Sequence, residues 1–103
     1  MFDDRKKGYE KKIDLDIQKK FKVTAIRNKS LGRWAGEELG LDNSKIDGYI
    51  DEVIMADFDE PGFEDVINKI LSDFKKAGIS ISYNEIKEKL LEYENEAISK
   101  ISE

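Results

Sequence analysis

The acidic run Asp57–Gly62 carries the residue types best suited to bind a metal ion. Acids stand at its first and third positions and a glycine at its sixth, as in the helix–loop–helix calcium loop. The pattern then fails, because Pro61 takes the fifth position and Asn68 takes the twelfth, where a bidentate Glu is needed. We therefore expect no metal here. Glu64 and Asp65 fit an acidic helix start, where carboxylates complement the helix dipole.

Catalytic chemistry has little support elsewhere in the chain. Histidine and cysteine are both absent, so the commonest general base and every thiol reaction are missing. The 23 Asp and Glu residues guarantee close carboxylate pairs, but no spacing singles one pair out. We expect no catalytic residue and no cofactor, and we predict that the protein is not an enzyme.

Cations cluster with an aromatic residue around the segment Arg27–Lys29, together with Arg33 and Trp34. Such a group is typical of a phosphate or base-stacking site. The alternative is that Trp34 belongs to the core and the cations form one solvated helix face. We favour the second interpretation.

The N-terminal segment is basic, whereas the chain as a whole has a net charge of −5. The first 24 residues hold eight basic and five acidic side chains. Phe2, Tyr9, Ile13 and Ile17 follow one helical face, but Gly8 costs about 1 kcal/mol relative to alanine inside a helix. We predict that this segment is frayed or disordered alone and becomes helical on a partner. A plain solvated tail is the alternative.

Helical periodicity dominates the remaining sequence. The apolar residues between Phe63 and Phe74 recur at helical spacing, and Ala77 and Gly78 supply a stop. Ser82 and Glu85 form a capping box before the last helix. Three further sets define the other apolar faces: Ile46, Tyr49, Ile50, Val53 and Ile54; Ile86, Leu90, Tyr93, Ala97 and Ile101; and Phe21, Ala25, Gly32, Ala35 and Leu39.

The second helix is predicted to begin after Asp42 as its cap, and the first to span about Ile17 to Leu39. Four amphipathic helices with short connections predict an all-α, four-helix bundle with a mobile N-terminal segment. The 103 residues suit one domain, divided into a mobile segment, residues 1–16, and a bundle, residues 17–103. No apolar run has the length of a membrane span, and we expect a cytoplasmic protein.

Several stretches together resemble a known family, the zeta inhibitor subunit of the alphaproteobacterial F-type ATP synthase. The similarity is most specific at the opening and between Arg27 and Leu41, and it weakens after Ser82. The matching residues are Phe2–Arg5, Lys7, Glu10–Lys12, Phe21–Lys22, Ala25, Arg27–Lys29, Leu31–Gly32, Trp34–Ala35, Leu39–Leu41, Ala56–Phe58, Pro61–Gly62, Glu64–Val66, Asp73–Phe74 and Ala77–Gly78.

This resemblance implies a four-helix bundle whose mobile N-terminal segment inhibits ATP hydrolysis. The segment would enter the catalytic head between the alpha and beta subunits, near the central rotor, and block rotation in the hydrolytic direction. Gly8 and the lysine-rich stretch beside it depart from the family pattern. The partner-binding residues implied are Phe2, Asp3, Asp4, Arg5, Lys7, Tyr9, Glu10, Lys11, Lys12 and Ile13.

The partner expected is therefore the ATP synthase at the inner membrane, with no membrane insertion, no nucleic acid and a monomeric free protein. Two alternatives stay open. The chain could be a non-inhibitory helical interaction module of the same fold, or a nucleotide-binding module that uses the basic residues.

Overall fold

The computed structural model describes the backbone of residues 2–59 and 62–102, and the side chains of residues 17–58 and 62–101. Within these residues the chain forms four helices and no strand. They are α1 (Phe2–Glu38), α2 (Asn43–Asp59), α3 (Glu64–Lys76) and α4 (Tyr83–Ser102). The predicted all-α, four-helix architecture is confirmed.

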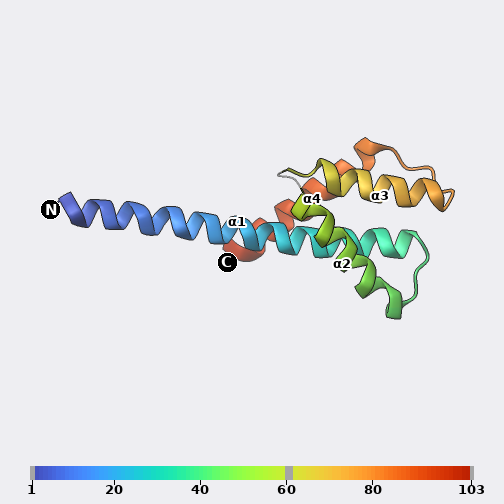
Figure 1. The fold of residues 1–103 in the computed structure, drawn as a ribbon, viewed down its shortest axis with the longest axis horizontal. Helices are drawn as coiled ribbons and strands as arrows, with labels where there is room; N and C mark the ends of the chain where they lie inside the picture. Colours follow the sequence, from blue (N-terminus) through green and yellow to red (C-terminus); the bar gives the residue numbers. More distant parts are fainter. Residues whose placement is uncertain (1, 60–61, 103) are drawn as a thin grey trace.

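The first helix is the long element of the fold. Its 37 residues correspond to about 55 Å of helix, which explains most of the 62 Å length of the molecule. The C-terminal half of α1 packs against α2 and α4, and its N-terminal half extends beyond the other helices (Figure 1). The predicted start near Ile17 is therefore wrong, because the helical backbone begins at Phe2.

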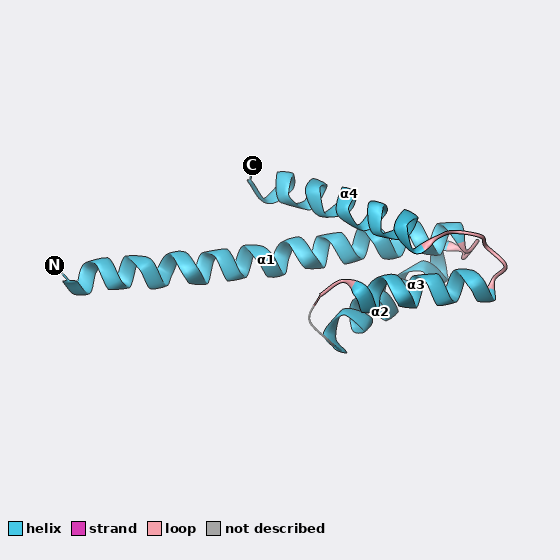
Figure 2. Cartoon of the chain, turned by 90° about the horizontal axis from the view of Figure 1, so that it is seen from above, coloured by secondary structure: helices cyan, strands magenta, loops and turns pink. Residues whose placement is uncertain are grey.

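The remaining helices close the bundle around α1. Helix α3 packs against α2 and α4, and α4 returns along α1, so its C-terminal end lies near the middle of that helix (Figure 2). One buried cluster joins all four helices. Its members are Leu31, Ala35, Tyr49, Val53, Val66, Ile67, Ile70, Phe74, Ile86 and Leu90.

Aromatic packing ties α1 to α3 inside this cluster. The Trp34 and Phe74 rings meet edge to face, with centroids 5.7 Å apart, and Phe74 is fully buried. The prediction that these two residues share one core is confirmed.

The helix ends follow the sequence signals. The Lys45 amide donates to Asp42 Oδ1 at 3.2 Å, and the Glu85 amide donates to Ser82 Oγ at 3.2 Å, so both predicted N-caps form. At the end of α3, Gly78 adopts φ +75° and the Ile79 amide donates to the Phe74 carbonyl at 2.8 Å. That pattern is the left-handed glycine termination which the sequence predicts.

Helices α1 and α2 approach each other closely at Gly32. A Cβ atom at this position would lie 3.1 Å from the Ile50 Cα atom and 3.5 Å from the Val53 Cβ atom. Such a contact is tighter than most Cβ contacts in proteins, so a larger residue would push the Ile50 backbone away by a few tenths of an ångström. Gly32 therefore sets how α2 crosses the first helix.

Candidate protein-interaction site

The predicted partner-binding residues all fall in the first half of α1. Their backbone is helical from Phe2 onward and projects from the body (Figure 1). The side chains of residues 2–16, which include Phe2 to Ile13, lie outside the described residues. Their roles and the division at residue 16 therefore stay predictions.

A polar cluster lies where α1 meets the end of α2 and the C-terminal half of α4. The Asn28 Nδ2 atom donates to Asp57 Oδ2 at 3.0 Å, and Arg27 Nε donates to Asn28 Oδ1 at 3.1 Å. The Arg27 guanidinium also lies 3.5 Å from Asp57 Oδ1 and 3.6 Å from Glu94 Oε1. These four side chains connect α1 with both α2 and α4, and we call them the α1 clamp.

The α1 clamp corrects the expectation that Arg27 belongs to a solvated face. Arg27 is only 6% exposed and Asn28 only 2%, because both sit where α1 is covered by α2 and α4. A buried guanidinium needs carboxylate partners, and Asp57 and Glu94 supply them. Burial and pairing make this cluster a structural connection rather than a surface for anions.

The other members of the cationic group are separated from Arg27. Lys29 and Arg33 are exposed, whereas the half-buried Trp34 packs on Phe74. The Lys89 Nζ atom lies 5.9 Å from the centre of the Trp34 ring. The interpretation of Trp34 as a core residue is therefore confirmed, and its ring is not presented beside the cations for base stacking.

The acidic run contributes to the α1 clamp through Asp57. The side chains of residues 59–61 lie outside the described part of the chain. Among the described side chains, no group of three or more carboxylates is arranged to hold a metal ion.

A second polar group joins α2 to α3 at Tyr49. The Tyr49 hydroxyl donates to Asp73 Oδ2 at 2.9 Å, and Lys69 Nζ donates to the same oxygen at 2.8 Å. Burial raises the pKa of Tyr49 well above its ordinary value, and the hydrogen bond to the Asp73 carboxylate raises it further. The phenol therefore stays protonated and acts as a structural donor.

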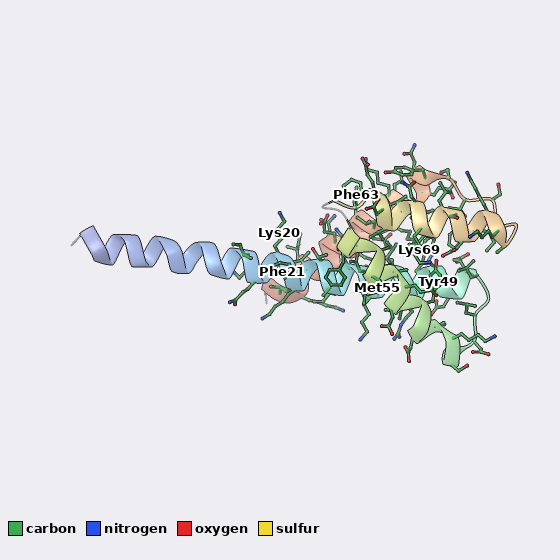
Figure 3. All side chains as sticks on the ribbon, in the orientation of Figure 1. Lys20, Phe21, Tyr49, Met55, Phe63 and Lys69 are labelled. Atoms are coloured by element: carbon green, nitrogen blue, oxygen red, sulfur yellow. The ribbon has the colours of Figure 1, made fainter. Side chains whose placement is uncertain are left out.

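Exposed apolar side chains lie next to the α1 clamp. Phe21 is 71% exposed and Phe58 is 77% exposed, although they come from different helices. Both line a groove between α1 and α2, together with Ile17 and Ile54. The sequence analysis placed Phe21 on the core stripe, which is wrong, because Phe21 lies in this open groove, whereas α4 runs past this part of α1 next to Lys19 and Val23 (Figure 3). The sequence analysis gave Phe58 no binding role of its own.

Comparison with known families gives the identity of this long helix and its bundle. A family model described as ATPase inhibitor subunit zeta matches residues 1–100. The chain belongs to this family. The match includes both the projecting part of α1 and the bundle, so the zeta resemblance is confirmed over nearly the whole chain.

Two further findings concern this zeta-family member. No curated protein matches the chain. Within the described residues, none of the helices is long and apolar enough to cross a membrane.

Proposed function

We propose that this protein inhibits ATP hydrolysis by the F-type ATP synthase. The segment of residues 1–16 inserts into the catalytic head, between the alpha and beta subunits and near the central rotor. Its contacts come from the residues between Phe2 and Ile13. The observation that carries the proposal is that α1 belongs to a zeta-family chain and projects from the bundle as one continuous helix.

Geometry favours a helix as the inserted element. A projecting helix can enter a groove as a single amphipathic segment, which is a recurrent mode of recognition between proteins. Ordering a disordered segment on its partner costs free energy, and this cost falls when the helical conformation is already favourable. The folded part of α1 supplies a preformed helical turn on which residues 1–16 can continue.

The α1 clamp gives this helix a firm base. Arg27 and Asn28 connect it to α2 through Asp57, and Arg27 reaches α4 through Glu94. Force or displacement at the inserted segment would therefore be resisted by three helices rather than by one. We propose that the bundle remains outside the catalytic head as the anchor.

The nucleotide-binding alternative gains no support from the same residues. Arg27 already pairs with two carboxylates, and the Trp34 ring packs against Phe74. Neither is free to hold a phosphate or a base without breaking a core contact. We therefore retain the regulatory function as the proposal.

The direct test adds the purified full chain to ATP synthase from its own source. We expect ATP hydrolysis to fall in a saturable manner, while ATP synthesis is largely spared. A chain lacking residues 1–16 should fold, by far-ultraviolet circular dichroism, without inhibiting. Equal inhibition by the two chains would show that the inhibitory contact lies elsewhere.

Point substitutions sharpen this test within the full chain. Tyr9→Ala and Ile13→Ala should each raise the concentration needed for half inhibition, because they remove apolar contact from the inserted segment. Lys29→Ala is a suitable control, since Lys29 is exposed on the same helix but far along it from the segment. The control should inhibit like the unmodified chain.

A further inference from the structure

The groove between α1 and α2 is lined by large apolar side chains that stay exposed instead of joining the buried core. Phe21 and Phe58 are among the most exposed large apolar side chains of the described residues, and Ile17 is 48% exposed. Together with Ala25 and Ile54 they line a hollow of about 600 Å³. Contiguous exposed apolar surface of this kind marks interaction sites more often than isolated residues do.

The position of this groove relates it to the projecting helix. On the continuous α1 backbone, positions 9, 13, 17 and 21 form one row spaced by four residues. Such a row is a ridge on the helix surface. The apolar positions of the N-terminal segment therefore run directly into Ile17 and Phe21, without a break at residue 16.

Charge defines the kind of surface that would cover the groove. Lys19, Lys20 and Lys22 are exposed on the same turns of α1, and Lys20 lines the groove itself (Figure 3). Asp57, the carboxylate that lines it, is bonded to Asn28 and Arg27 in the α1 clamp. A partner surface that is apolar at its centre and carries carboxylates at its rim matches this arrangement.

We infer that the groove formed by Ile17, Phe21 and Phe58 is a second docking surface for the same protein complex that receives residues 1–16. The inference rests on the proposed function, because its partner is the ATP synthase catalytic head. The occupant is an apolar, acid-rimmed surface of that head, next to the entrance used by the N-terminal segment. The body thus binds directly through side chains of both α1 and α2, in addition to supporting the inserted helix.

The test compares two surface variants of the full chain. Phe21→Gln and Phe58→Gln each remove an exposed ring, and glutamine is compatible with a helix. Met55→Gln is the matched control, because Met55 is 65% exposed on α2 but lines a different depression with Asp51, Glu52 and Lys69. Binding to immobilised ATP synthase is measured together with the concentration for half inhibition of hydrolysis. Circular dichroism checks that each variant is folded.

We expect Phe58→Gln and Phe21→Gln to weaken binding about tenfold or more, as for central apolar contacts of an interface, and Met55→Gln to leave it unchanged. If the unmodified chain inhibits and both Phe variants bind like it, the groove is not a docking surface, and the proposed function stands. If the unmodified chain binds without inhibiting, while the Phe variants lose binding, the docking surface stands and the inhibitory function fails.

The remaining occupant to test is a second copy of the chain. Sedimentation velocity of the unmodified protein and of Phe58→Gln measures this directly. We expect both to sediment as monomers. A dimer that Phe58→Gln dissociates would assign the groove to self-association and overturn the inference.

Discussion

The Asn28 side-chain amide donates to the Asp57 carboxylate at 3.0 Å, across 29 residues of sequence. This bond connects the last turn of α2 to the C-terminal half of α1. Arg27 reinforces it, because its guanidinium lies between Asp57 and Glu94. Buried polar contacts as well as apolar packing therefore join α1 to α2 and α4.

Arg27→Ala should destabilise the protein strongly. It removes the cation from two part-buried carboxylates, Asp57 and Glu94, and leaving such groups without their partner costs about 1–3 kcal/mol or more. Arg33→Ala is the matched control, because Arg33 is exposed on the same helix and should change stability by less than about 0.5 kcal/mol. Chemical denaturation measures the free energy of unfolding of both variants. Equal values would show that the α1 clamp contributes nothing to stability.

Gly32→Ala and Gly48→Ala should change stability in opposite directions. At Gly32 the new methyl group would meet the Ile50 backbone at 3.1 Å, so we expect a loss of about 1–3 kcal/mol. At Gly48 nothing lies within 4 Å of the new methyl group, and alanine gains up to about 1 kcal/mol in a helix. The melting temperatures of the two variants distinguish two explanations. A decrease for Gly32→Ala together with an increase for Gly48→Ala indicates close packing at Gly32, whereas equal changes would indicate a general effect of replacing glycine.

Phe74→Ala should cost about 3–5 kcal/mol, since Phe74 is fully buried and contacts Trp34. That loss is a large share of the roughly 5–15 kcal/mol that holds a typical domain together. Tryptophan fluorescence reports the change directly, because Trp34 is the single tryptophan of the chain. A variant with unchanged stability and emission would contradict the shared core.

The helices and their caps could be predicted because their signals are local. The apolar spacing from Phe63 to Phe74 and the caps at Asp42 and Ser82 each involve residues within a few positions of one another. The Arg27–Asp57 pair had no such signal, since the two residues meet only after α1 and α2 have packed. Periodicity also placed Phe21 on a buried face, because it identifies a face but not how far neighbouring helices extend along it.

Ser82→Ala should lower the free energy of unfolding by about 0.5–2 kcal/mol, because the Glu85 amide would lose its side-chain acceptor. Ser80→Ala is a useful control, as Ser80 is also exposed and precedes the same helix without occupying its cap. Thermal unfolding followed by circular dichroism compares the two. An identical melting temperature for both variants would argue against the cap as a source of stability.

Gly8→Ala should strengthen inhibition of ATP hydrolysis. Glycine inside a helix costs about 1 kcal/mol relative to alanine, and for a segment that is frayed alone and becomes helical on its partner this corresponds to roughly fivefold in affinity. The gain appears only if the segment binds as a helix at this position and the partner leaves room for a methyl group.

Titration of hydrolysis with Gly8→Ala and with Gly48→Ala separates this effect from a general increase in stability, because Gly48 lies on α2, outside the segment. We expect the first variant to inhibit at lower concentration and the second to inhibit like the unmodified chain. Weaker inhibition by Gly8→Ala would place the glycine at a close contact with the partner or in a non-helical turn of the bound segment.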